Sequence, residues 1–309
     1  MRIQSRQRIQ LLLILLTLGI NFSSPVLANK NQLMNYYTSL QPVLNKNVYG
    51  IPIYIDSRDE NNTMKGTIYG IIKHPFDFLA NSVTLASHWC ELAPQHLNIK
   101  ACTYQPVNQK CLLRFYSGRK FYEKADDVYQ LEYRFELLTQ EMDFIHIRLS
   151  AEEGPVGTSH YQINLKAIPL NEKQSFVYFS YTYQYNFIAS MAMGTYLSTV
   201  GSDKLGFSIT GQDMDGKPVY IKGVRGIIER NSVRYFLAIK SFLDTLNLPT
   251  EKRFEARINQ WFDLTERYHR QLYEMDKADY LVYKNKERLD QIRLQGAIKT
   301  VDSKPSICR

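Results

Sequence analysis

The feature that most constrains the fold of this chain is a series of segments, within residues 98–222, in which apolar and polar residues alternate one by one. Their apolar members are Leu131, Tyr133, Phe135 and Leu137, then Ile145, Ile147 and Leu149, then Tyr161, Ile163 and Leu165, and finally Val177, Phe179, Tyr181, Tyr183, Tyr185 and Phe187. Successive side chains of a strand point to opposite faces of a sheet, so each series predicts a strand with one apolar face. Short polar connections such as Pro169–Lys173 indicate an antiparallel meander.

An apolar sheet face must be covered, and the segment Ile227–Leu246 supplies an amphipathic helix. One helical face is mostly charged and the other is apolar, with Ile228, Tyr235, Phe236, Ile239, Phe242, Leu243 and Leu246. Asn247 and Pro249 end this helix. We therefore expect an α+β fold in which a curved antiparallel sheet grips a long C-terminal helix.

Extra C-terminal helices are predicted from Glu251 to Leu294, where apolar residues recur at helical spacing. We expect them to belong to the core by packing on the outer face of the sheet; the alternative is that they dock a partner protein. Residues 297–309 lack such a pattern and are expected to form a flexible tail.

The chain before the meander divides into a polar lead-in and a first strand with a helical insertion. Residues 29–63 form the expected lead-in, with one short helix and an exposed turn region at Asp56–Asn62. Met64–Lys73 is expected to be a strand that His74–Pro75 ends. An apolar stripe then predicts a helix that Pro94 ends; the stripe is Phe76, Leu79, Val83, Ala86 and Trp89.

The N-terminus has the three-part layout of a secretory signal peptide. Three arginines precede an apolar run from Ile9 to Ile20, and Ser23–Ala28 ends in a small-x-small-like cleavage site. We expect cleavage after Ala28 and a periplasmic or secreted mature protein. The alternative is an uncleaved anchor helix, although an apolar run of about a dozen residues is short for a bilayer.

The charge balance argues against nucleic acid as a partner. The 309 residues include 38 Lys and Arg against 30 Asp and Glu, and removing residues 1–28, with three Arg and no acids, leaves 35 against 30. The basic residues form no run of five or six, as on a solvated surface. A weak contact with an anionic membrane surface is compatible with this small surplus. With 44% hydrophobic residues, the chain can bury one sizeable core.

The four cysteines of an exported chain are first of all disulfide candidates. Of the three possible pairings we favour the one that joins Cys90 to Cys102, and the pairing of Cys111 and Cys308 stays open. A metal site is the alternative because two histidines bracket Cys90, but the spacings match no zinc pattern. We expect no metal.

The order of the expected elements resembles that of START/Bet v 1-like (helix-grip, SRPBCC) proteins. It is a strand, a helical insertion with Trp89, about six antiparallel strands and a long C-terminal helix. The resemblance covers residues 64–247 and implies an apolar cavity between the sheet and the gripped helix. Five strings are more closely similar to an uncharacterised family of exported bacterial proteins: His88–Glu91, His96–Lys100, Gly118–Phe121, Glu153–Thr158 and Arg225–Asn231. The expected divisions are a signal peptide (1–28), a lead-in (29–63), a START-like domain (64–247), a helical extension (248–296) and a tail (297–309).

The common catalytic signatures are missing from the sequence. It has no Gly-x-Ser-x-Gly elbow, no phosphate-binding glycine loop and no His-Glu-x-x-His motif. We expect no cofactor, and a binding protein rather than an enzyme. His146 falls at a polar position of its strand and is expected at the surface or at the rim of the sheet.

Two groups of side chains are candidate ligand contacts. The start of the long helix carries Arg225, Glu229, Arg230, Asn231 and Arg234, which could hold the carboxylate, phosphate or sulfate group of a ligand. Alternatively, Glu229 pairs with an arginine such as Arg119 and pins helix to sheet, and Lys204 joins either network. The second group is aromatic: Tyr181, Tyr183 and Tyr185 share a strand face, with Tyr116, Phe121, Tyr133 and Phe135 as companions.

The expected ligand-binding residues are Tyr116, Arg119, Phe121, Tyr133, Phe135, Tyr181, Tyr183, Tyr185, Glu229, Arg230 and Arg234. If the implied cavity is open, this lining suits a lipid, a sterol or hopanoid, or an aromatic ligand; if side chains fill it, the tyrosines are simply core. We therefore expect an exported carrier or binder of a hydrophobic ligand. The alternatives are an envelope assembly module with a protein partner, and a cyclase-like or hydrolase-like enzyme that uses Glu229 or His146 as acid or base.

Overall fold

A computed structural model of the chain describes residues 25–108, 110–199, 201–298 and 308. Most of the expected signal peptide lies outside these residues, so cleavage after Ala28 stays a prediction. Most of the expected tail lies outside them as well. Within the described residues, no helix has both the length and the apolar character needed to cross a membrane.

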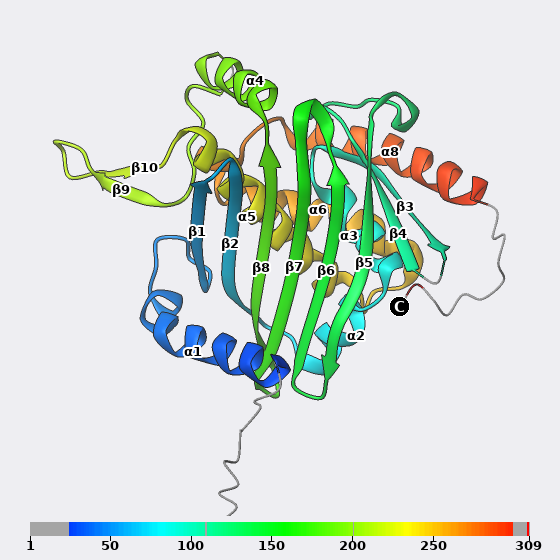
Figure 1. The fold of residues 1–309 in the computed structure, drawn as a ribbon, viewed down its shortest axis with the longest axis horizontal. Helices are drawn as coiled ribbons and strands as arrows, with labels where there is room; N and C mark the ends of the chain where they lie inside the picture. Colours follow the sequence, from blue (N-terminus) through cyan, green and yellow to red (C-terminus); the bar gives the residue numbers. More distant parts are fainter. Residues whose placement is uncertain (1–24, 109, 200, 299–307, 309) are drawn as a thin grey trace, which may run out of the picture.

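The centre of the fold is one antiparallel sheet of eight strands in the order β1-β2-β8-β7-β6-β5-β4-β3 (Figure 1). The predicted alternation corresponds to its strands: Phe179 of β8 lies opposite Ile68 of β2 and Leu165 of β7, and all three are buried. The α+β fold class expected from the sequence is therefore confirmed. The strands are β1 (Ile53–Glu60), β2 (Thr63–Ile72), β3 (Ile99–Val107), β4 (Lys110–Ser117), β5 (Tyr129–Glu141), β6 (Phe144–Glu153), β7 (Thr158–Asn171) and β8 (Gln174–Tyr185).

The concave face of the sheet holds α5 (Gly223–Thr245), the predicted amphipathic helix. Two glycines of β2 let this helix come close: a Cβ at Gly66 would lie 2.2 Å from Ser232 Oγ, and one at Gly70 would lie 2.6 Å from the Phe236 ring. Buried side chains fill most of the space between the sheet and α5. This is the helix-grip arrangement.

The C-terminal helices lie on the side of the sheet that holds α5 and not on its outer face (Figure 1). They are α6 (Thr250–Glu266), α7 (His269–Leu272) and α8 (Lys277–Ala297), and α8 packs along the edge strand β3. Their expected place on the outer face is wrong, because α1 (Pro25–Asn45) packs there instead. Leu33 and Leu44 of α1 join a separate cluster with Tyr69 and Phe176.

The lead-in contains more regular structure than expected. Residues 53–60 form the edge strand β1 where the sequence suggested a turn region, and only Asn61 and Asn62 make the turn. The inward-facing Ser57 is polar, so apolar alternation stops there, but the residue is 2% exposed and its hydroxyl donates to Glu229. Because Ser57 pairs with Glu229 of the helix, the strand lacks the apolar alternation that would have predicted it.

Two further segments depart from the predicted pattern. The helical insertion bends at Thr84 into α2 (Phe76–Val83) and α3 (Ala86–Leu92), followed by the 3₁₀ turn η1 (Ala93–Gln95). The predicted strand through Phe187 ends at Tyr185, because the Asn186 side chain caps a new helix by accepting from the Ala189 N–H at 3.1 Å. The remaining elements are η2 (Ala125–Asp127), η3 (Pro155–Gly157), α4 (Phe187–Ser198), β9 (Ile209–Gln212) and β10 (Pro218–Tyr220).

Two disulfides tie helices and tail to the sheet. The predicted pair Cys90–Cys102 joins α3 to β3, and Cys111 of β4 pairs with Cys308. The Cys308 carbonyl also accepts a hydrogen bond from the Ala86 N–H at 3.2 Å. The residue that the sequence assigned to a flexible tail is therefore anchored.

Candidate ligand-binding cavity

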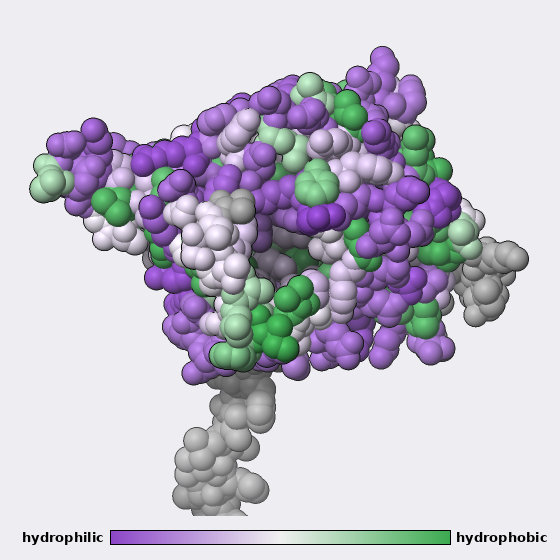
Figure 2. All heavy atoms as spheres, turned by 90° about the horizontal axis from the view of Figure 1, so that it is seen from above, coloured by the Kyte–Doolittle hydropathy of each residue, from purple (hydrophilic) through white to green (hydrophobic). Residues whose placement is uncertain are grey.

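A cavity of about 150 Å³ remains between the sheet and α5, at the end of the molecule where η3 and α4 lie. Seen from above, this end is hollowed at its centre; pale and hydrophobic residues form part of the rim, and hydrophilic residues form the rest (Figure 2). The lining combines apolar, aromatic and neutral polar side chains: His96, Asn98, Ile99, Phe115, Ser117, Leu131, Tyr133, Pro155, Tyr161, Tyr181, Asn231 and Tyr235.

The strand and helix periods explain why these side chains meet. Tyr133, Tyr161 and Tyr181 occupy inward positions of β5, β7 and β8, and Tyr181 lies diagonal to Tyr161 because it pairs with the next residue but one along β7. From the other side, Asn231 and Tyr235 are four residues apart on α5 and therefore share one face of the helix. The Tyr181 and Tyr235 rings meet with their centroids 5.7 Å apart.

Three phenol groups of the cavity are unpaired. The Tyr161 hydroxyl donates to Thr158 Oγ1 at 2.7 Å, but the hydroxyls of Tyr133, Tyr181 and Tyr235 make no hydrogen bond with any described residue. Burial raises the pKa of Tyr161 to about 12 and raises the pKa of Tyr133 and Tyr181 well above the ordinary value. These phenols are neutral, so each can both donate and accept a hydrogen bond.

His96 adds a neutral imidazole to the lining. It is 3% exposed and its ring stacks on Tyr235 with centroids 4.7 Å apart. Burial, followed by the charges of Arg234 and Lys284, lowers its pKa well below the ordinary value, although the neighbouring Asn231 acts in the opposite direction. The Asn98 N–H lies 3.2 Å from Nδ1, so Nδ1 accepts and the ring proton resides on Nε2, which has no partner among the described atoms.

The sequence did not identify His96 as a cavity residue. It lies in the loop between η1 and β3, where no periodic pattern indicates the direction of a side chain. The sequence indicated it only as a possible metal ligand and as part of the string His96–Lys100. Within the described residues, no group of His, Cys, Asp and Glu could hold a metal ion. The signal that could have identified it is its position in the sequence, between the buried residues Trp89 and Cys90 of α3 and the buried strand β3.

Of the aromatic residues expected to bind a ligand, Tyr133 and Tyr181 line the cavity and the others do not. Tyr183 shares the same sheet face and stacks on Tyr161 with centroids 5.3 Å apart, beside the cavity. Tyr185 lies further along β8, where its hydroxyl donates to Asp59 Oδ1 at 2.8 Å. Phe135 is buried in the main core.

Three residues expected at the cavity face elsewhere. Tyr116 packs with Ala101 and Ala125 in a separate cluster, because it follows the inward-facing Phe115 on β4 and points to the opposite face. Arg119 and Phe121 come after the strand has ended; Phe121 is 46% exposed, and the Arg119 guanidinium stacks on its ring at 4.5 Å.

Glu229 is fully buried, but it does not touch the cavity and does not pair with Arg119. Its carboxylate accepts from Ser57 Oγ at 2.6 Å, Ser208 Oγ at 2.7 Å and the Phe207 N–H at 2.7 Å. Arg119 pairs with Glu123 instead. Glu229 therefore fastens α5 to β1 and to the segment before β9. This is the structural role expected as the alternative, with Ser57, Phe207 and Ser208 as partners instead of Arg119.

The arginines of the same helix also have structural partners. Arg230 Nη1 donates to the Leu205 carbonyl at 3.2 Å, and Arg234 Nη2 pairs with Glu274 Oε1 at 2.9 Å. Lys120 and Lys204 pair with the other oxygen of Glu274 at 2.7 and 3.0 Å. Burial raises the pKa of Glu274, but Arg234 and Lys120 outweigh it and lower this pKa to about 2. These arginines line no part of the cavity.

Glu229 and His146, the residues of the acid–base hypothesis, both lie outside the cavity. His146 lies on the outer face of β6, where Nε2 is 3.1 Å from Asn164 Oδ1, and its neighbours Ile145 and Ile147 point into the core. Neither side chain is part of the cavity lining.

Comparison with known proteins gives similarity at the level of solved structures. A conserved protein of unknown function from Enterococcus faecalis has 10% identity and a TM-score of 0.35, over 77% of this chain and 98% of that one. The human StAR-related lipid transfer protein 5 has 9% identity and a TM-score of 0.35, over 71% and 98%. The Zhui aromatase/cyclase from Streptomyces sp. R1128 has 11% identity and a TM-score of 0.32, over 67% and 95%. No family model and no curated protein matches the sequence.

Similarity this distant carries no argument about the ligand or the reaction. The class of protein follows instead from the chain's own strand order and from the position of α5 in the concave sheet. The fold and the cavity define a helix-grip protein with an internal, tyrosine-lined space.

Proposed function

We propose that this chain is an exported binding protein for a small aromatic molecule that carries a polar group. The observation that supports the proposal most directly is a cavity of about 150 Å³ whose lining presents unpaired phenol groups and the Nε2 atom of His96. Buried polar groups without partners cost free energy, and a ligand that pairs with them recovers part of that cost.

The volume selects among the ligand classes that the sequence left open. Drug-sized ligands occupy pockets of roughly 300–1,000 Å³, whereas a cavity of about 150 Å³ accommodates a benzene ring. This favours an aromatic ligand over a sterol, a hopanoid or a long acyl chain. Because the lining also includes Asn98, Ser117 and Asn231, the cavity is less apolar than expected and suits a phenol or an indole.

The lining favours binding over acid–base catalysis. The described lining residues include no carboxylate, and the lowered pKa of His96 keeps its imidazole neutral near pH 7. A neutral Nε2–H group can hold a ligand oxygen in place, but it is a weak general acid. The two disulfides support the proposed periplasmic or secreted location, because such bonds persist in oxidising compartments.

The proposal is tested by calorimetric titration of the purified mature chain with phenol, indole, palmitate and cholesterol. We expect saturable binding of phenol and indole, and no binding of palmitate or cholesterol. Ser117→Leu adds bulk to the lining at the end of β4 and should abolish binding while the far-ultraviolet circular dichroism stays unchanged. Equal binding by wild type and Ser117→Leu would place the ligand elsewhere.

A matched pair of tyrosine variants tests the polar contacts. Tyr235→Phe removes one unpaired hydroxyl from the cavity, whereas Tyr178→Phe removes one from the outer face near α1. Because a hydrogen bond contributes about 1 kcal/mol net, phenol affinity should fall roughly fivefold in Tyr235→Phe and stay constant in Tyr178→Phe. An unchanged affinity in both variants would remove the polar part of the proposal.

A further inference from the structure

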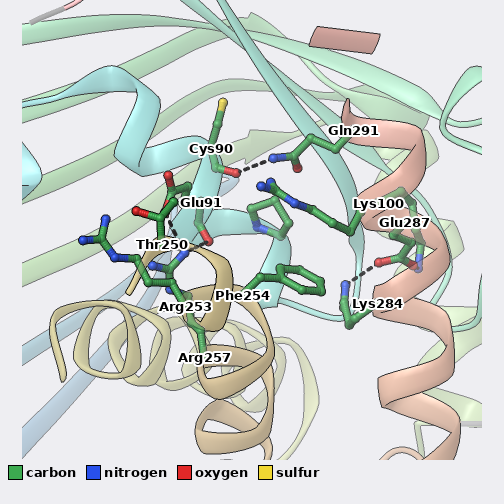
Figure 3. A pocket seen from close by; sticks show the side chains of 12 residues that line it. Cys90, Glu91, Lys100, Thr250, Arg253, Phe254, Arg257, Lys284, Glu287 and Gln291 are labelled. Carbon is green, nitrogen blue, oxygen red and sulfur yellow. Dashed lines mark hydrogen bonds and ion pairs between the residues drawn. The ribbon is translucent and has the colours of Figure 1, made fainter. Parts of the chain in front are cut away.

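Another pocket, of about 60 Å³, lies between α3, α6 and α8 and is separate from the tyrosine-lined cavity. Its charged lining residues face one another across the ring of Phe254 (Figure 3). Five of them are basic and two are acidic, so positive charge is in excess. The full lining is Cys90, Glu91, Pro94, Lys100, Thr250, Arg253, Phe254, Arg257, Lys284, Glu287, Arg288 and Gln291.

On the α8 side, two buried lysines share a single carboxylate. Lys100 Nζ lies 3.0 Å from Glu287 Oε1, and Lys284 Nζ lies 2.6 Å from Glu287 Oε2. Both side chains are nearly inaccessible, at 0% and 3% exposure. Burial lowers the pKa of Lys284 to about 8. One carboxylate cannot neutralise two ammonium groups, so this side of the pocket keeps a positive surplus.

On the α6 side, a buried arginine has a free donor. Arg257 is 3% exposed, its Nη1 donates to Glu91 Oε2 at 2.9 Å, and its Nε donates to Thr245 Oγ1 at 3.3 Å. Its Nη2 has no partner among the described atoms. Glu91 and the Phe242 ring, which lies 4.6 Å from the guanidinium carbon, hold the side chain in place. A buried guanidinium N–H without an acceptor is costly unless a ligand supplies one.

Two more guanidinium groups carry charge that no acidic residue in the described part of the chain neutralises. Arg253 is bound only through Nε, which donates to the Leu248 carbonyl at 2.8 Å, and Arg288 lies over Phe254 at 5.4 Å. Neither forms an ion pair within the described residues. Thr250 begins α6, a helix of 17 residues whose N-terminal dipole adds positive potential.

We propose that this pocket binds a small oxyanion, either free phosphate or the carboxylate of a small organic acid. The surplus of cations, the free Nη2 of Arg257 and the start of α6 all favour a negative charge, and arginine forks match the planar or tetrahedral oxygens of such groups. The pocket is too small for a larger ligand to enter with more than its charged group. This site is independent of the aromatic ligand proposed for the cavity.

The test is thermal unfolding of the full chain with increasing inorganic phosphate or acetate, at an ionic strength held constant with sodium chloride. We expect a saturable rise in the melting temperature with one of the two anions, and the more effective anion identifies the group. Arg288→Met should weaken the apparent affinity about tenfold, because it removes one charged donor without disturbing the buried network.

Arg293→Met is the matched control, since Arg293 lies on the same helix, is 53% exposed and is absent from the pocket. Its response to the anion should equal that of the wild type. Phosphate also stabilises proteins without binding, so the difference between the two variants is the decisive quantity. The proposal is overturned if neither anion exceeds chloride, or if both variants respond as the wild type does.

Discussion

Two buried carboxylates at α5, those of Glu229 and Glu274, differ in the groups that bind them. Glu229 is held by two serine hydroxyls and backbone N–H groups, whereas Glu274 is held by Arg234, Lys120 and Lys204. The second carboxylate therefore stabilises the folded state only while it is charged. It links α5, the loop after β4 and the segment after α4 through one group.

Stability should depend on the ionisation of Glu274 in acid. Its pKa is lowered from 4.5 to about 2, so its contribution is complete above pH 4.5 and is lost as the pH falls toward 2. The shift corresponds to about 3 kcal/mol. In urea unfolding at pH 7 and pH 3, Glu274→Gln should lose stability at pH 7 and show a weaker pH dependence than wild type. The exposed Glu255→Gln is the control; identical pH dependence in all three proteins would contradict the assignment.

Single residues also show what the sequence could and could not predict. Tyr133 and Tyr181 lie on the cavity side of the sheet as expected, because strand alternation fixes the side on which a residue lies. Tyr116 was not, because inward and outward residues are both buried at that end of β4. The role of Arg234 depends on Glu274, which lies 40 residues later, and no local pattern predicts such a partner.

At the level of elements, the gripped helix was visible in the sequence, but its surroundings were not. The apolar stripe of 227–246 predicts α5, yet the stripes of α6 and α8 say nothing about which surface they cover. The structure places α6 against α5, where Trp261 Nε1 donates to the Arg234 carbonyl at 3.0 Å, and it places α8 against β3 and η1, where the Tyr280 hydroxyl donates to the Gln95 carbonyl at 3.0 Å. Their burial supports a role in the core over a role in docking.

Trp261 is the residue whose loss should test this core role. It is 1% exposed and stacks on Tyr280 with centroids 5.2 Å apart, so Trp261→Ala should cost about 3–5 kcal/mol in the free energy of unfolding. Val282→Ala, at a 51% exposed position of α8, should change it by less than about 0.5 kcal/mol. Urea unfolding measures both. A small loss for Trp261→Ala would mean that α6 is an appendage.

The helix α4 is the element suited to the expected weak contact with a membrane surface. Phe187, Ile188 and Met191 are 76%, 63% and 60% exposed, and α4 follows β8 at one end of the sheet (Figure 1). We predict that replacing Phe187 and Ile188 by Ser lowers co-sedimentation with phosphatidylglycerol vesicles, whereas Met142→Ser, in the β5–β6 turn, does not. Sedimentation that is absent in wild type, or equal in all three proteins, would contradict this contact.

At the scale of the whole molecule, the fold leaves a small polar-aromatic space between the sheet and α5, at the end where η3 lies. The disulfides hold the wall formed by α3, β3 and β4, and α8 supports the same wall through Lys284, which donates to the carbonyls of His96 and Ile99. The side chains of both residues line the cavity. The wall is therefore held from outside by covalent bonds and hydrogen bonds, and we expect the cavity to keep its shape without a ligand.

Anomalous diffraction from a crystal soaked in 4-bromophenol tests the central claim most directly. The account predicts one strong bromine peak between the sheet and α5, with the phenol oxygen within hydrogen-bond distance of His96 Nε2 or of a hydroxyl of Tyr133, Tyr181 or Tyr235. A well-diffracting soaked crystal with no bromine in this cavity, or with the cavity closed by its own side chains, would contradict it.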